Sequence, residues 1–197
     1  MTRKLTLFLV CFVDVTLILF LLAWTAWAEN KLRVYEVSSP PSCTNNLGQI
    51  VHFRSVDRGS AKSAAGMAKR DESGMPIVYR FAYHKSPYAL QRFIDFHECA
   101  HHQTGDVDLP HPPKNSPQHL MNESVADCIA TLRIRDELEN GSDTIAQAVT
   151  ELLGTMRDIG FPDVTLESRK SNIMNCLSKR ETADTFIDGI LQYRGLK

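Results

Sequence analysis

The sequence has almost no excess of charge of either sign. Its 197 residues include 22 lysines and arginines against 23 aspartates and glutamates, for a formal net charge of -1. Proteins that bind the phosphate backbone usually present a clustered basic face, so no nucleic-acid partner is expected. The chain also lacks internal repeats and low-complexity tracts. Its length favours one globular domain behind a short N-terminal segment.

Cysteines are few, and no two of them form a CxxC pair. Cys11 lies near the N-terminus, and the other four are Cys43, Cys99, Cys128 and Cys176. The missing pairs argue against a zinc ribbon. In an oxidising compartment, four cysteines predict disulfides, with three possible connectivities. The alternative is that some of them are buried free thiols.

Long apolar runs are missing except at the N-terminus. An apolar segment from Leu5 to Trp27 follows two basic residues, and the Ala26-Trp27-Ala28 triplet fits the small-x-small pattern of a signal peptidase site. We therefore predict a signal peptide over residues 1–28 and a single domain over residues 29–197.

An uncleaved inner-membrane anchor is the alternative for the same segment, because the run is nearly long enough to span a bilayer. Asp14 disfavours it, since a carboxylate at the bilayer centre costs roughly 2.5–3.5 kcal/mol. With either outcome we expect an exported domain, periplasmic or secreted, that contacts the membrane only if the segment is retained.

The residue pattern predicts an α+β fold that is mainly helical. Residues 75–83 alternate β-branched and aromatic side chains and form the best strand, residues 49–56 form a weaker one, and residues 57–76 are expected to be a loop or a frayed helix. Helices are expected over residues 87–103, from 117 or 120 to 138, from a cap at Ser142 or Asp143 to 159, and over 163–179 and 181–193.

The chemistry is concentrated in the segment His97-Glu98-Cys99-Ala100-His101, an HExxH motif. Positions i and i+4 share one face of a helix, so both histidines can bind one cation, with Glu98 beside them. The alternative is that the two rings simply pack in a core. Each buried ring would then need its own hydrogen-bond partner, whereas a metal satisfies both.

Catalytic zinc usually keeps three protein ligands and one water. The extended HExxHxxGxxH pattern fails here, because Thr104 and Val107 occupy its glycine and third-histidine positions. Glu123 and Asp127 lie one turn apart on the next predicted helix. Glu123 is therefore the candidate third ligand, and Asp127 the candidate hydrogen-bond partner of a ligand histidine. The alternative is a solvated acidic helix face.

HECAHH followed by NESVADCIA resembles the gluzincin type of zinc metallopeptidase, and the stretch from residue 75 to 127 is similar to compact, often bacterial, peptidase-like domains. The resemblance implies a zincin-like fold with an edge strand packed on the motif helix. It implies one Zn²⁺ bound by His97, His101 and Glu123. It also implies that Glu98 acts as base and then as acid, with Asp127 hydrogen-bonded to His97.

A peptide or protein substrate follows from this reading, with an extended peptide pairing along the free edge of the strand at residues 75–83. No residue matches the family's oxyanion-stabilising group, for which residue type alone offers four candidates: His102, His111, His119 and Tyr193. Two further readings stay open: a metal-binding pseudoenzyme that serves as an envelope scaffold, and an amidase acting on a non-peptide bond. The intact Glu98 argues against the pseudoenzyme.

A disulfide between the two site helices is one hypothesis for the cysteines. Cys99 follows Glu98, and Cys128 follows Asp127. Consecutive helical side chains point roughly 100° apart, however, which leaves two core thiols as the alternative.

Overall fold

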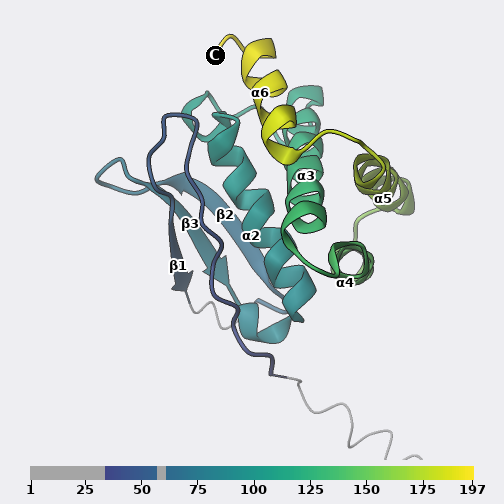
Figure 1. The fold of residues 1–197 in the computed structure, drawn as a ribbon. Coiled ribbons are helices and arrows are strands. Elements are labelled where there is room, and N and C mark those ends of the chain that lie inside the picture. Colours follow the sequence, from purple (N-terminus) through teal and green to yellow (C-terminus); the bar gives the residue numbers. More distant parts are fainter. Residues whose placement is uncertain (1–33, 57–60) are drawn as a thin grey trace, which may run out of the picture. The chain divides into compact units, whose positions relative to one another are not determined.

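The sheet has three strands, and its central strand is the one that the sequence predicts best. In the computed structural model, which describes residues 34–56 and 61–197, the strand order is β1-β3-β2 (Figure 1). β3, Pro76–Phe81, pairs in parallel with β1, His52–Val56, and antiparallel with β2, Ala65–Arg70. The prediction that residues 75–83 form a free edge strand is therefore wrong, because β3 is hydrogen-bonded on both sides.

β2 is the strand that the sequence analysis missed, since residues 57–76 were expected to be a loop or a frayed helix. Its sequence, AGMAKR, contains residue types that are depleted in strands. A tight turn returns the chain to β3: the Asp71 carboxylate accepts hydrogen bonds from the amides of Ser73 and Met75, and Gly74 adopts a φ of 82°. Pairing with β3, rather than local propensity, makes this segment a strand.

Five helices follow the sheet, and the fold is α+β and mainly helical, as predicted. α2, Tyr88–Gln103, lies on one face of the sheet. α3, Pro117–Glu137, packs against the side of α2 that faces away from the sheet. α4 (Gly141–Asp158), α5 (Asp163–Leu177) and α6 (Ala183–Tyr193) surround α3 (Figure 1). Short 3-10 turns span Tyr83–Lys85 and Asp106–Asp108. The motif helix is thus enclosed between the sheet and the helical layer.

Local signals place the ends of the helices that carry the motif residues. α2 ends at Gln103 with Thr104 as its C-cap, after which Gly105 adopts a φ of 77°. Ser116 caps α3 by accepting a hydrogen bond from the amide of His119, and Pro117 occupies the first turn.

The expected cap of α4 at Ser142 or Asp143 is wrong, because that helix already begins at Gly141. A Cβ there would lie 2.5 Å from the carbonyl oxygen of Ile134. Only glycine therefore allows this close approach to the end of α3.

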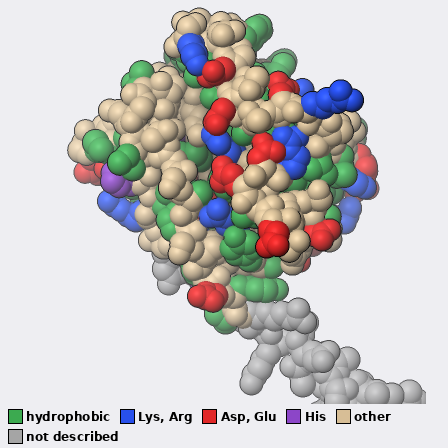
Figure 2. All heavy atoms as spheres, viewed as in Figure 1, with side chains coloured by type: hydrophobic (Ala, Val, Ile, Leu, Met, Phe, Trp, Pro, Cys, Tyr) green, Lys and Arg blue, Asp and Glu red, His purple; other side chains and the backbone are tan. Residues whose placement is uncertain are grey.

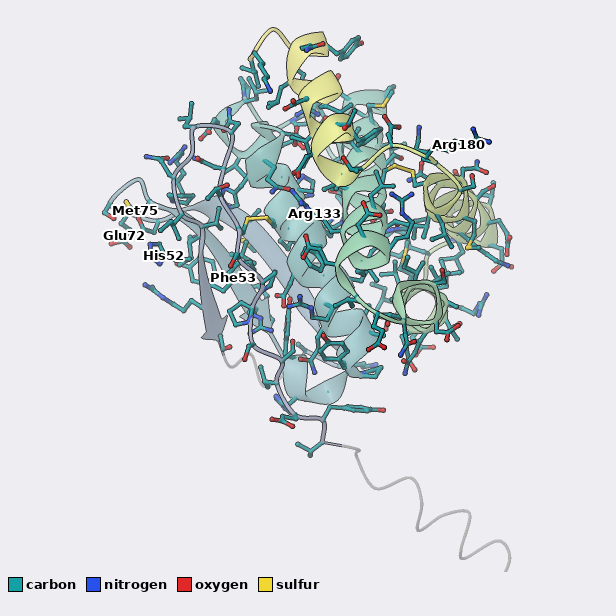
Figure 3. The ribbon with its side chains drawn as sticks, viewed as in Figure 1. His52, Phe53, Glu72, Met75, Arg133 and Arg180 are labelled. Carbon is teal, nitrogen blue, oxygen red and sulfur yellow. A yellow bond between two sulfur atoms is a disulfide. The ribbon has the colours of Figure 1, made fainter. Side chains whose placement is uncertain are left out.

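Both disulfides join elements that are distant in sequence, and the hypothesis of a Cys99–Cys128 bridge is wrong. Cys43 pairs with Cys99, and Cys128 pairs with Cys176 (Figure 3). Cys99 packs with Cys43 and Val78 on the sheet side of α2. Cys128 packs with Leu132 and Ala183 on the far side of α3. The two sulfurs therefore face away from each other.

Charged side chains of both signs intermingle on the face of the molecule seen in Figure 2, in keeping with the balanced composition. No helix within residues 34–56 and 61–197 has the length and apolar character needed to cross a membrane. The predicted signal peptide, residues 1–28, lies outside the described residues.

Candidate metal centre

Two helices bring two histidines and a carboxylate to one point. His97 and His101 lie one turn apart on α2, and Glu123 comes from the facing side of α3. The Nε2 atoms of the two rings are 3.2 Å apart. Glu123 Oε2 lies 3.3 Å from His97 Nε2, and Glu123 Oε1 lies 3.6 Å from His101 Nε2. One potential ligand atom from each of the three residues falls within 4.8 Å of the others.

These distances agree with the geometry of a zinc site. Tetrahedral zinc with ligand bonds of about 2.0–2.2 Å separates its ligand atoms by about 3.3–3.6 Å. The separations of 3.3 and 3.6 Å fall within that range, and the 3.2 Å between the two Nε2 atoms is only slightly shorter. Two imidazoles and one carboxylate also form a donor set that catalytic zinc uses, with one coordination position left open. The residues therefore fit a zinc ion.

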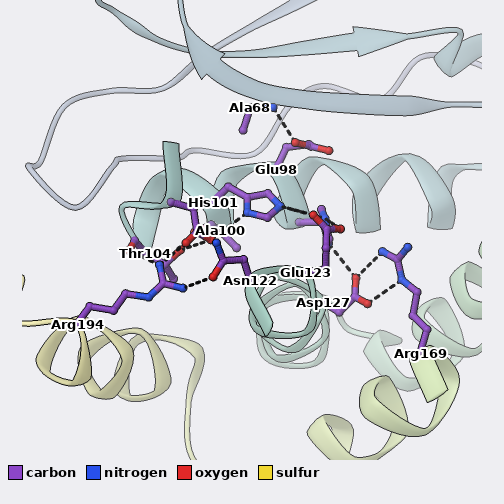
Figure 4. Close-up of polar contacts among 12 residues, drawn as sticks. Ala68, Glu98, Ala100, His101, Thr104, Asn122, Glu123, Asp127, Arg169 and Arg194 are labelled. Atoms are coloured by element: carbon purple, nitrogen blue, oxygen red, sulfur yellow. Dashed lines mark hydrogen bonds and ion pairs between the residues drawn. The ribbon is translucent and has the colours of Figure 1, made fainter. Parts of the chain in front are cut away.

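The predicted contact between His97 and Asp127 is present, and a partly buried arginine reinforces it. His97 Nδ1 lies 2.8 Å from Asp127 Oδ1. Arg169, from α5, donates to both oxygens of the same carboxylate, at 2.7 Å each (Figure 4). Because an ionised carboxylate only accepts hydrogen bonds, the ring proton is on Nδ1 and the Nε2 lone pair points to the cluster.

His101 is oriented in the same way by a second carboxylate. Its Nδ1 lies 3.0 Å from Asp106 Oδ2, which also accepts a hydrogen bond from Thr104 Oγ1 at 3.1 Å. Arg194 pairs with the other oxygen of Asp106. Both histidines thus present Nε2 lone pairs towards each other, an arrangement that is favourable only when a positive charge lies between them.

The charges around His97 favour a cation at this point. Burial by itself lowers the pKa of His97, but hydrogen bonds to Asp127 and Glu123 and their charges outweigh it and raise that pKa to about 10. Burial opposes ionisation of Glu123 as well, yet the adjacent His97 and His101 hold the pKa of this carboxyl below its usual range. Without a metal, the cluster therefore retains a proton that a cation can replace.

Glu98 lies beside the cluster but points towards the sheet. Its Oε2 accepts a hydrogen bond from the backbone amide of Ala68 in β2, at 2.7 Å (Figure 4). A Cβ on Gly66 would lie only 2.3 Å from Glu98 Cγ, so the carboxylate occupies space that this glycine leaves free. β2 and Glu98 therefore determine each other's position.

A cleft of about 330 Å³ opens over these side chains. One wall is β2 at Gly66, Met67 and Ala68, and the opposite wall includes Asn122 and Glu123 of α3. β2 pairs with β3 alone among the described residues, so its free edge borders the cleft. His97, His101 and Glu123 thus line an open cleft beside an edge strand.

The structure separates the four candidates for the oxyanion-stabilising residue. His102 is 1% exposed and its Nε2 donates to the carbonyl of Ile77, away from the cleft. Tyr193 is 87% exposed and does not line the cleft. His111 and His119 do line it, and His119 Nδ1 is buried without a hydrogen-bond partner among the described residues. The two remaining candidates are therefore His111 and His119.

Three residues of the site were missed by sequence reasoning: Asp106, Arg169 and Arg194. Asp106 lies five residues after His101 in a segment that reads as a loop, where an aspartate is common. The two arginines lie 42 and 88 residues away from the carboxylates that they contact, and no local spacing links them to the motif. Only the packing of α5 and α6 against the rest of the fold brings the two arginines to these carboxylates.

A scan against protein-family models, a search of curated proteins and a search of solved structures found no match to this chain. The functional interpretation therefore rests on the side chains of the site itself.

Proposed function

We propose that this protein is a zinc-dependent hydrolase, and specifically a peptidase of the gluzincin type. The observation that carries the proposal is the close approach of donor atoms from His97, His101 and Glu123. The two Nε2 atoms are 3.2 Å apart, and the two carboxylate oxygens of Glu123 lie 3.3 Å from His97 Nε2 and 3.6 Å from His101 Nε2. The position of Glu98 beside these three residues, rather than among them, favours an enzyme over a purely structural metal site, because a structural site does not need that carboxylate.

Glu98 has the position and chemistry of a general base. Bound zinc supplies Lewis-acid activation of water and of a carbonyl group. The Ala68 amide holds Oε2 of Glu98, which leaves Oε1 to take a proton from the attacking water. The same carboxyl then passes the proton to the leaving amine. His97 and His101 keep their rings oriented through the bonds to Asp127 and Asp106.

An extended peptide is the substrate that the groove favours. Backbone groups alternate in direction along a strand, so Gly66 directs its groups to the same side as Ala68. An extended chain laid along β2 can hydrogen-bond this edge, and its scissile carbonyl would face the cluster. β2 replaces the predicted strand at residues 75–83 in this role.

Export remains part of the proposal. Two disulfides in a chain of 197 residues suit an oxidising compartment such as the periplasm or the outside of the cell.

Metal analysis and activity of the purified chain test the proposal together. We expect one zinc per chain and cleavage of an unfolded protein substrate; a chelator should abolish cleavage, and added zinc should restore it. Absence of zinc from protein never exposed to a chelator would contradict the proposal. Zinc without any turnover would favour the scaffold or binding-module alternative.

Replacing Gly66 by alanine is expected to lower kcat/KM by roughly 100-fold, because the new methyl group displaces Glu98 and misplacement of a catalytic group by about 1 Å has an effect of this size. Zinc affinity should change little, since the three atoms nearest to a Cβ at Gly66 all belong to Glu98, which is not a candidate ligand. Gly154→Ala is the matched control, because a Cβ at Gly154 meets nothing within 4 Å. Unaltered kcat/KM in Gly66→Ala would argue that Glu98 has another role.

A further inference from the structure

The C-terminal end of the chain reaches into the metal site through one arginine. Arg194 directly follows α6. Its Nη1 donates to the carbonyl oxygen of Thr104 at 2.7 Å and also to Asp106 Oδ1. Its Nη2 donates to Asn122 Oδ1 at 3.0 Å (Figure 4). One guanidinium therefore joins the end of α2, the 3-10 turn that directly follows it, and α3.

Each of these contacts lies close to a residue of the cluster. Thr104 is the C-cap of α2, three residues after His101, and Asp106 is hydrogen-bonded to the His101 ring. Asn122 directly precedes Glu123 on α3. Arg194 therefore bridges the surroundings of two of the three candidate ligands.

The contact between Arg194 and Asp106 is buried, so its loss is expected to disturb the site. The side chains of Arg194 and Asp106 are only 10% and 7% exposed. Loss of one partner from a buried pair leaves the other charge uncompensated and free to move towards water. The planar fork of arginine also matches several acceptors at once, which the single ammonium of lysine does not.

We infer that Arg194 is a positioning residue for the metal site: it fixes Asp106, and through Asp106 the ring of His101, so that the C-terminal end of the chain sets the affinity for zinc. This inference rests on the proposed zinc site. Arg169 has the corresponding place behind His97, but the Cys128–Cys176 disulfide ties its helix to α3. No disulfide among the described residues reaches α6, so Arg194 itself makes the polar link between this end of the chain and the site.

Zinc affinity of the full chain tests the inference without any substrate. The dissociation constant would be measured by competition with a chromophoric chelator for the wild type, R194Q and R194K. Changes in groups behind a metal ligand typically cost 10–100-fold in affinity, so we expect R194Q to bind zinc at least tenfold more weakly. R194K keeps the positive charge but loses the planar fork of arginine, so its dissociation constant should lie between those of the wild type and R194Q.

R135Q is the matched control. The Arg135 guanidinium also donates to two backbone carbonyls, of Lys179 and Glu181, and to the Asp136 carboxylate, but none of these borders the site. We expect R135Q to bind zinc as the wild type does. Circular dichroism of the zinc-free proteins would show which variants fold.

The outcomes separate the two proposals. A wild type that binds no zinc overturns the proposed function. If the wild type binds zinc tightly and a folded R194Q binds it equally well or more tightly, the inference is overturned but the proposed function stands. Removal of the nearby positive charge would then matter more than loss of the hydrogen bonds that position Asp106. If R194Q does not fold, the other two variants decide. The inference is overturned if R194K has the dissociation constant of the wild type, or if R135Q loses as much zinc affinity as R194K.

Discussion

Replacing Glu98 by glutamine is expected to reduce kcat by about two to four orders of magnitude, the usual contribution of general acid–base catalysis, while one zinc per chain is retained. The amide has the size of the carboxyl group and its oxygen can still accept the hydrogen bond from Ala68. It cannot take up a proton from water, however. The variant therefore removes the proposed chemistry and leaves the surroundings of the metal in place.

The measurement is kcat and KM on a peptide substrate, together with zinc content, for the wild type and Glu98→Gln. Glu72→Gln is a suitable control, because Glu72 is an exposed residue of the β2–β3 turn and should tolerate the change. Full activity in Glu98→Gln would exclude this residue as the base. Loss of zinc from the variant would instead indicate that Glu98 is a ligand.

Loss of the Cys128–Cys176 disulfide is expected to lower the free energy of unfolding by about 4 kcal/mol, because the bridge closes a long loop in the unfolded chain. The two cysteines are 48 residues apart in the sequence, and loop-closure entropy at that length accounts for the magnitude. The bridge joins α3, which carries Asp127, to α5, which carries Arg169. Its removal should therefore also weaken the support behind His97.

Chemical denaturation of the Cys128→Ala/Cys176→Ala double variant would measure this effect. The Cys43→Ala/Cys99→Ala double variant is a matched comparison, since its loop spans 56 residues and the entropic model predicts nearly the same loss of stability. Peptide mapping of unreduced protein should recover only these two pairs among the four cysteines of the described part. A Cys99–Cys128 peptide, or free thiols at these positions, would contradict the pairing.

The motif helix could be predicted from sequence because its signals are local. Spacing of i and i+4 places His97 beside His101 on any α-helix, and the same spacing places Glu123 beside Asp127. Ser116, Pro117 and Gly105 mark helix ends through their own backbone preferences. Zinc itself remains a prediction, but the side chains that were predicted to surround it lie together.

Tertiary packing, rather than local sequence, decides which strand forms the edge beside the cleft and which histidines remain candidates for the oxyanion-stabilising residue. Nothing within AGMAKR favours a strand, and β2 exists because β3 supplies hydrogen-bond partners. The same packing turns His102 towards Ile77 and leaves His119 at the cleft. Residue type alone could not distinguish these two histidines.

The sequence by itself determined the helices, the α+β class and the residues that can bind a metal, because these depend on neighbours within one helical turn. Only the tertiary structure decided which strand borders the cleft, how the cysteines pair, and that Asp106, Arg169 and Arg194 lie behind His97 and His101. Such contacts join residues tens of positions apart. Their partners are selected by the burial of whole helix faces, which no short spacing in the sequence records.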